Sequence, residues 1–190
     1  SALQNCLALG LFPVIPDLKR HSPKEGELFR RQDPLSLGRQ LVEHGAPALS
    51  VVTESRHFKG ELAILREVAA GISVPILRKD FLTEERDVTV SRQAGAAAIL
   101  LIAAFLPPTR LSRLREAARR EGLEVLVEVH TEDELYRALE TEPDMLGINN
   151  RDILRLETDE GGVEITERLA PLVPKGVFVI SESGLSSPQD

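Results

Sequence analysis

The sequence is poor in the residue types on which several kinds of site depend. It holds a single cysteine, Cys6, no tryptophan, and only 4% aromatic residues. One cysteine excludes an internal disulfide and suits a reducing compartment. The four histidines are scattered at positions 21, 44, 57 and 130, so the chain offers no metal-ligand spacing.

Long apolar segments and a surplus of basic residues are also lacking. No apolar run approaches the roughly 20 residues that a membrane helix needs, and the first residues lack the basic start and cleavage site of a signal peptide. The net charge is −7, with acidic residues spread along the chain, whereas a nucleic-acid-binding surface needs a basic stripe. We therefore predict a cytoplasmic protein that binds a small molecule and engages neither nucleic acid nor a membrane.

Short apolar runs rich in valine, isoleucine and leucine alternate with amphipathic segments along the chain. This alternation is typical of βαβ units around a parallel sheet. The predicted strands are residues 13–18, 48–52, 75–78, 98–102, 125–129, 145–148 and 177–181. The predicted helices lie near residues 34–44, 60–70, 83–94, 109–121, 132–140 and 163–171. We expect one domain, residues 1–190, because the length is that of a single globular unit.

The ends of the predicted helices carry clear signals. Thr83 and Thr131 are each followed by acidic residues, which favour the first turn of a helix. Gly45, Gly95 and Gly122 stand where helices should end, and we expect them to adopt left-handed backbone conformations there.

Such a strand and helix series forms either an open doubly wound sheet or a closed barrel. A dinucleotide-binding open sheet is disfavoured, because no G-x-G-x-x-G turn follows the first strand. Polar residues instead follow nearly every strand, at the end that carries the active site in a barrel. They are Asp17, Lys19, Thr53, Glu54, Lys79, Asp80, Glu128, His130, Asn149, Asn150, Arg151, Glu182 and Ser183. The fold prediction is an α/β protein, a (β/α)8 TIM barrel with about seven of its eight strands present.

Glu128 differs from the other polar residues because it lies inside an apolar strand, in VLVEVH. A solvated loop position therefore does not explain it. A carboxylate near the mouth of a barrel should be paired with a cation or kept as a base.

Seven segments of the chain resemble the indole-3-glycerol phosphate synthase family, in the order of the family and at about its spacing. They are LKRHSP at 18–23, ALSVVTESRHFKG at 48–60, PILRKDF at 75–81, AAAILLIA at 96–103, LVEVH at 126–130, GINNRDI at 147–153 and SESGL at 181–185. The resemblance implies a barrel of the phosphate-binding type. It implies an enzyme of tryptophan biosynthesis whose substrate is 1-(2-carboxyphenylamino)-1-deoxyribulose 5-phosphate, which undergoes ring closure and decarboxylation. It also implies a carbon–carbon lyase that needs no metal and no organic cofactor.

The resemblance further implies roles for individual residues. Lys79 matches the general acid of the family and Glu128 its general base, while Lys19 matches the lysine that binds anionic groups and helps ring closure. Asp17 is implied to be a fourth catalytic residue; it stands two residues before Lys19, where the family usually has Glu, so its reach is one methylene shorter.

The implied substrate-binding residues fall into three groups. An apolar pocket for the anthranilate ring would be lined by Phe58, Phe81 and Leu100. Polar groups that hold the substrate would be Ser22, Asn149 and Arg151. Part of the phosphate site would be Ser183 and Gly184, with Glu182 beside them.

Family members continue past SESGL through an eighth strand with a phosphate loop, and they begin with an extra helical segment. The seven predicted strands would therefore leave free edges. Three alternatives stay open: a portion of a longer protein, omitted segments, or an oligomer in which another copy completes the edge. Asp17 and the missing loop also leave open a non-catalytic or altered paralogue that binds a phosphorylated ligand or acts as a scaffold. Phosphoribosylanthranilate isomerase would explain the fold but not RKDF together with LVEVH.

Overall fold

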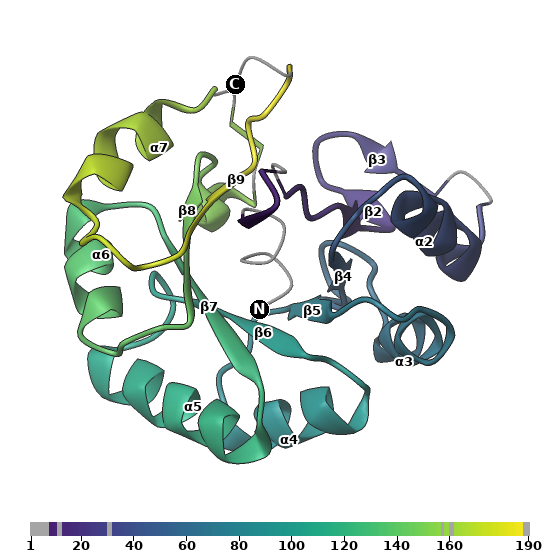
Figure 1. Ribbon diagram of the computed structural model, residues 1–190, viewed down its shortest axis with the longest axis horizontal. Coiled ribbons are helices and arrows are strands. Elements are labelled where there is room, and N and C mark those ends of the chain that lie inside the picture. Colours follow the sequence, from purple (N-terminus) through teal and green to yellow (C-terminus); the bar gives the residue numbers. More distant parts are fainter. Residues whose placement is uncertain (1–7, 11–12, 30–31, 157, 160–161, 188–190) are drawn as a thin grey trace. The chain divides into compact units, whose positions relative to one another are not determined.

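The computed structural model describes residues 8–10, 13–29, 32–156, 158–159 and 162–187, in which strands and helices alternate along the chain (Figure 1). The strands are β1 (Asp17–Leu18), β2 (His21–Ser22), β3 (Gly26–Glu27), β4 (Leu49–Val52), β5 (Ile76–Lys79), β6 (Ala98–Ile102), β7 (Glu124–Val129), β8 (Met145–Asn149) and β9 (Val179–Glu182). The helices are α2 (Pro34–Glu43), α3 (Leu62–Gly71), α4 (Glu85–Gln93), α5 (Pro108–Glu121), α6 (Glu132–Leu139) and α7 (Glu164–Leu169), with short 3-10 turns at Ile153–Arg155 and Ala170–Leu172.

Seven strands hydrogen-bond in the order β1-β4-β5-β6-β7-β8-β9, which follows the chain. The neighbouring strands are parallel, for example β4 with β5 and β7 with β8. Seven parallel strands separated by helices confirm the strand number and the alternation that the sequence predicts.

The first two strands of the chain differ from the prediction. Residues 13–18 are predicted as a strand, but only Asp17–Leu18 pairs with β4. Pro13 and Pro16 have no amide hydrogen, so neither can donate a hydrogen bond to a neighbouring strand, although the Pro16 carbonyl accepts one from the Ser50 amide at 2.9 Å. The antiparallel pair β2–β3 is not predicted, since two-residue strands are too short to show an alternation.

The chain divides into two compact units. The first comprises residues 1–80 and 89–99, and the second residues 81–88 and 100–190. That residues 1–190 form a single domain stays a prediction.

In the first unit, the core lies between the parallel strands and the helices that follow them. Leu18 of β1, Leu49 of β4 and Leu65 of α3 are fully buried there. Helix α2 is capped by the preceding residue, Asp33, whose carboxylate accepts a hydrogen bond from the Ser36 amide at 2.7 Å.

In the second unit, residues 125–129 of β7 are all buried, as are the inner faces of α5 and α6. Thr131 caps α6, as predicted, by accepting a hydrogen bond from the Glu134 amide at 3.2 Å. The other predicted helix start, Thr83, lies two residues before α4, where its amide donates to the Asp87 carboxylate at 3.1 Å.

The three glycines predicted to end helices all have left-handed backbone angles. Their φ values are +97° at Gly45, +91° at Gly95 and +70° at Gly122. Each glycine thus ends a helix and allows the chain to turn toward the next strand.

Candidate active site

In the first unit, Asp17 and Lys79 lie on one face of the sheet. Asp17 is in register with Ser50 of β4, and Val52 of the same strand is in register with Lys79 of β5. Residues 50 and 52 share a face because strand side chains alternate, so Asp17 and Lys79 share it too. The Lys79 ammonium is 3.5 Å from the Asp17 carboxylate, and the Lys79 side chain is 15% exposed.

The charges around Asp17 keep its carboxylate ionised. Burial alone would raise the pKa of Asp17, but the nearby ammonium groups of Lys79 and Lys19 and the Ser50 hydroxyl outweigh burial and lower it. In the first unit, the Asp17 carboxylate therefore pairs with Lys79, the predicted general acid, at the carboxyl end of β5.

Lys79 is flanked in sequence by a buried hydrogen-bond network. The Arg78 guanidinium donates to the Thr53 hydroxyl at 2.9 Å, to the Asp80 carboxylate at 2.8 Å and to the Ser91 hydroxyl at 2.9 Å. Thr53 also donates to Asp80 at 2.6 Å. The residues on both sides of Lys79 are thus fixed to β4 and α4, which holds the backbone of Lys79 in place.

Lys19 lies beside a predicted aromatic residue. Its ammonium is 5.7 Å from the centre of the Phe58 ring, within the range of a cation–π contact. The loop that presents Phe58 is organised by Glu54, which accepts hydrogen bonds from the amides of Arg56, His57 and Phe58 at 2.8, 2.7 and 3.0 Å. Burial would raise the pKa of Glu54, but these amides and His57 lower it. The sequence places Glu54 at a strand end without giving it this role.

Ser22, predicted to bind substrate, lies in β2 and is buried. Its hydroxyl accepts hydrogen bonds from the amides of Lys24 and Glu25, both at 3.3 Å. These contacts give Ser22 a part in shaping the β2–β3 turn.

In the second unit, three predicted site residues share one face of the sheet. Glu128 of β7 is in register with Gly147 of β8, and Asn149 of β8 is in register with Glu182 of β9. Residues 147 and 149 lie on the same face, so Glu128, Asn149 and Glu182 do as well. All three are buried, with Glu128 only 1% exposed.

Gly147 leaves room for a carboxylate on that face. A Cβ built at Gly147 would collide with the Glu182 carboxylate and would lie 3.3 Å from the Leu126 side chain. Because glycine has no side chain, Glu182 can lie across β8 above this residue.

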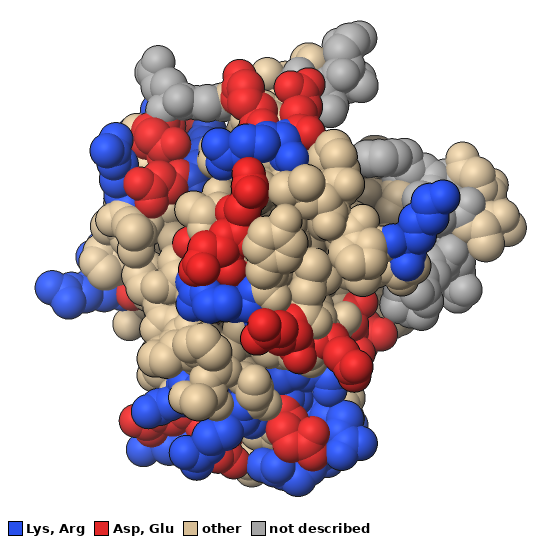
Figure 2. Space-filling model, turned by 90° about the vertical axis from the view of Figure 1, so that its left-hand side faces the viewer, with Lys and Arg blue, Asp and Glu red and all other residues tan. Residues whose placement is uncertain are grey.

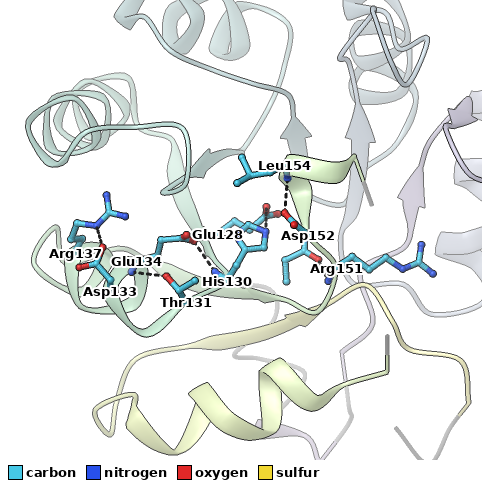
Figure 3. Close-up of polar contacts among 10 residues, drawn as sticks. Glu128, His130, Thr131, Asp133, Glu134, Arg137, Arg151, Asp152 and Leu154 are labelled. Atoms are coloured by element: carbon cyan, nitrogen blue, oxygen red, sulfur yellow. Dashed lines mark hydrogen bonds and ion pairs between the residues drawn. The ribbon is translucent and has the colours of Figure 1, made fainter. Parts of the chain in front are cut away.

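Glu128 is paired with His130, to which no role is given from sequence beyond that of a polar residue after a predicted strand. The His130 Nε2 is 3.4 Å from the Glu128 Oε1, and the His130 Nδ1 is 3.1 Å from the Glu134 Oε2 (Figure 3). Burial would lower the pKa of His130, but the two carboxylates outweigh it and raise the pKa to about 10. Glu128 therefore lies beside a cation, which is one of the two expected states of a carboxylate at this position.

Asn149, Asn150 and Arg151 follow β8 and have different surroundings. The Asn149 Oδ1 accepts from the Arg151 amide at 3.0 Å, while its buried Nδ2 has no hydrogen-bond partner among the described residues. Asn150, to which no role is given from sequence, donates to the Ser181 hydroxyl and to the carbonyls of Glu182 and Ser183 at 3.0, 3.1 and 3.2 Å. Asn150 therefore fixes the turn that follows β9.

That turn contains the predicted phosphate-binding residues. Ser183 and Gly184 have φ angles of +60° and +71°, so two successive residues are in the left-handed region. A Cβ at Gly184 would collide with the Gly162 carbonyl, which restricts this position to glycine. The residues SG thus form a tight turn directly after the carboxyl end of β9.

The apolar residues predicted to hold a ring occur in both units. Leu100 of β6 and Phe58 are buried. Phe81 packs edge-on against Phe105, with ring centres 5.2 Å apart.

No group of three or more potential metal ligands occurs among the residues that the structure describes. Within the same residues, every helix is too short or too polar to cross a bilayer. On the face drawn in Figure 2, basic and acidic side chains are interspersed. Among the described residues, helices α5 and α6 carry exposed ion pairs, Arg119–Glu116 at 2.8 Å and Arg137–Asp133 at 2.9 Å.

Solved structures of other proteins share the fold. A 3-hexulose-6-phosphate synthase from Salmonella typhimurium matches with a TM-score of 0.71 over 92% of this chain and 80% of that chain, at 11% identity. A 3-keto-L-gulonate-6-phosphate decarboxylase from Vibrio cholerae matches with a TM-score of 0.66 over 89% of this chain and 77% of that chain, also at 11% identity. The predicted fold class, an α/β protein of the TIM-barrel type, is confirmed.

Sequence comparison identifies the family. Indole-3-glycerol phosphate synthase of Pyrococcus furiosus is 43% identical over 178 residues, which are 94% of this chain and 78% of that protein. The enzyme of the same name from a Nocardioides species is 44% identical over 179 residues, 93% of this chain and 67% of that protein. The family model described as indole-3-glycerol phosphate synthase matches residues 3–190. The chain therefore belongs to the indole-3-glycerol phosphate synthase family.

Proposed function

We propose that this chain is a carbon–carbon lyase that converts 1-(2-carboxyphenylamino)-1-deoxyribulose 5-phosphate into indole-3-glycerol phosphate, carbon dioxide and water. The observation that carries the proposal is the buried Glu128 carboxylate, which lies in an apolar strand on the same face as Asn149 and Glu182. The names of the relatives favour this activity over a scaffold without turnover.

Lys79 is the proposed general acid. Its ammonium donates a proton to the ketone oxygen of the substrate, which makes the ketone carbon electrophilic enough for attack by the aromatic ring. A carbon–carbon bond forms, and loss of carbon dioxide from the attacking carbon restores the aromatic ring. The ion pair with Asp17 and the network around Arg78 support this role, because they hold an ammonium at the carboxyl end of β5.

Glu128 is the proposed general base. The hydroxyl left by ring closure departs as water after protonation, while a proton is removed from the neighbouring carbon of the new ring. A buried carboxylate that no solvent shell surrounds can accept this proton. The 3.4 Å contact with His130 is longer than a usual hydrogen bond, which leaves the carboxylate able to form a new bond to hydrogen.

The remaining predicted residues would bind the substrate. Arg151 would attract the anionic groups of the substrate. The buried Asn149 Nδ2, which has no hydrogen-bond partner among the described residues, would donate a hydrogen bond to the substrate. Ser183 and Gly184 would contribute to phosphate binding through the backbone amides of the tight turn that they form after β9. Lys19 would add a positive charge, with Phe58 and, from the second unit, Phe81 and Leu100 as apolar contacts.

The experiment that tests the function is a turnover assay with the synthetic substrate, in which indole-3-glycerol phosphate is followed by its fluorescence. We expect turnover by the wild type and a loss of about a hundredfold or more in kcat for Glu128→Gln, with little change in KM. Binding of the substrate without any product would contradict the function and favour the scaffold alternative. Turnover by Glu128→Gln at the wild-type rate would contradict only the role of Glu128.

We further propose a cytoplasmic location, because a single cysteine suits a reducing compartment. Fractionation of cells that express the protein tests the location. Two further statements stay predictions: that the protein does not bind nucleic acid, and that copies of the chain associate through a free sheet edge.

A further inference from the structure

The residues Glu128, His130 and Glu134 form a continuous row of alternating charge in the second unit. The His130 ring contacts Glu128 through Nε2 at 3.4 Å and Glu134 through Nδ1 at 3.1 Å. The side chains of these residues are 2%, 11% and 12% exposed, so solvent screens their charges little. We propose that His130, held by Glu134, is a positioning residue that fixes the Glu128 carboxylate and keeps it available as the base. This inference rests on the proposed function, because it assumes that Glu128 accepts a proton.

Glu134 contacts both the backbone amide and the ring of His130. Its Oε2 accepts a hydrogen bond from the His130 amide at 2.8 Å as well as contacting the ring at 3.1 Å. Its own amide donates to the Thr131 hydroxyl at 3.2 Å. This exchange between the helix cap and the third residue of the helix is a variant of the capping box. The position of the His130 ring is therefore set by Glu134, which is itself fixed in the first turn of α6.

The contact between His130 and Glu128 is suited to positioning. Among the described residues, the Glu128 Oε1 has no hydrogen-bond partner, so the ion pair is the polar contact that the structure gives this atom. At 3.4 Å the interaction is electrostatic, and it does not occupy the oxygen as a short hydrogen bond would. Removal of the ring would leave a buried carboxylate without its cation.

The charge on His130 depends on the groups that face it. Glu128 faces it from β7 and Glu134 from α6, and together they raise the pKa of His130 to about 10. Other charged groups nearby are engaged elsewhere: Asp133 pairs with Arg137 at 2.9 Å, and Asp152 pairs with Arg155 at 3.4 Å. In Figure 3, the Arg151 guanidinium points away from the His130 ring. The ring is therefore an imidazolium at neutral pH, with two carboxylates as its counter-charges.

The test compares His130→Gln and Glu134→Gln with the wild type in kcat, KM and the pH profile of kcat. For His130→Gln we expect kcat to fall about ten- to a hundredfold with KM within about twofold, since misplacement of the base affects the chemical step. The acidic limb of its profile should move to higher pH, because a carboxylate without its cation takes up protons more readily.

Glu134→Gln should behave differently, which separates positioning from general loss of structure. His130 then lacks one counter-charge, so the ring should lose its proton at a lower pH and the profile should gain an alkaline limb. The acidic limb should not move upward, since the cation next to Glu128 remains. Matched controls are His44→Gln, an exposed histidine at the end of α2, and Glu132→Gln, an exposed acid in the first turn of α6. Both should keep the wild-type profile.

An unchanged kcat and acidic limb in His130→Gln would overturn the inference. So would equal losses in both variants with unmoved limbs, because those indicate a purely structural role. If either variant fails to fold, nitrogen NMR of the His130 ring in the wild type decides: an imidazolium that persists to about pH 9 supports the inference, and titration near the ordinary value of about 6.5 overturns it. Wild-type turnover by Glu128→Gln would instead remove the role of Glu128 as the base, on which this inference rests, whereas failure of the wild type to form product would contradict the proposed function itself.

Discussion

The Lys79 ammonium and the Asp17 carboxylate are 3.5 Å apart, at the long end of the range for a hydrogen bond. The two residues are 62 positions apart in the sequence and meet because β1 and β5 both pair with β4. Aspartate therefore reaches Lys79 only loosely, and a longer acid at position 17 would approach the ammonium more closely.

Replacement of Asp17 by Glu should therefore raise kcat. The extra methylene lets the carboxylate approach Lys79 and hold its ammonium more firmly, and correct placement of a catalytic group can change rates on the order of a hundredfold. We expect a gain of about two- to tenfold, measured as initial rates at saturating substrate. Asp17→Asn is the matched contrast, since it keeps the size and removes the charge. A slower Asp17→Glu enzyme would show that the shorter acid is adapted to its site.

Lys79→Ala should reduce kcat about a hundredfold or more and change KM little, because the ammonium acts in proton transfer. Lys79→Arg should also lose most of its activity, since a guanidinium keeps the charge but scarcely releases a proton. Lys175→Ala removes an exposed lysine and serves as the control. Rates near the wild type in Lys79→Arg would show that Lys79 supplies only charge.

The sequence predicts the strands well where an apolar run is long and uninterrupted. Residues 98–102 are strand β6 as predicted, because every residue from Ala98 to Ile102 is buried. Glu128 could be singled out for the same reason, as a charge within a buried run. The resemblance to the family could then suggest a role for it.

The partners of Glu128 could not be predicted in the same way. His130 and Glu134 lie two and six residues after it, and a spacing does not tell toward which neighbour a ring turns. The role of Asn150 depends similarly on carbonyl groups of Glu182 and Ser183, more than 30 residues away. Sequence patterns report burial and periodicity, whereas these contacts depend on side-chain direction in the folded chain.

Arg151→Ala should raise KM about tenfold or more and leave kcat nearly unchanged. The guanidinium would attract an anionic group in both the ground state and the transition state, and such uniform binding affects KM. Arg155→Ala is the control, because Arg155 is an exposed arginine in the following 3-10 turn. Steady-state kinetics decide, and a fall in kcat alone would assign Arg151 to the chemical step.

The stability of the protein should depend on pH through His130. The pKa of His130 is raised from 6.5 to about 10 in the folded chain, so the folded state binds more protons than the unfolded state between these values. The stabilisation is complete below about pH 6.5 and is lost as pH rises through about 10. Urea denaturation at pH 7 and pH 9.5 should show a fall in the free energy of unfolding that is absent in His130→Gln. Parallel pH dependence in the two proteins would contradict the prediction.

Helix α6 has only eight residues, too few to be stable alone in water. Its first turn depends on Thr131 and Glu134, and Glu134 also holds the ring beside Glu128. Fraying of this one turn would therefore release the ring while the rest of the fold stays intact. On heating, the enzyme should lose activity before its circular dichroism changes. Hydrogen exchange at the Glu134 amide should follow the same temperature course as the loss of activity, which makes one backbone hydrogen a reporter of the working state of the enzyme.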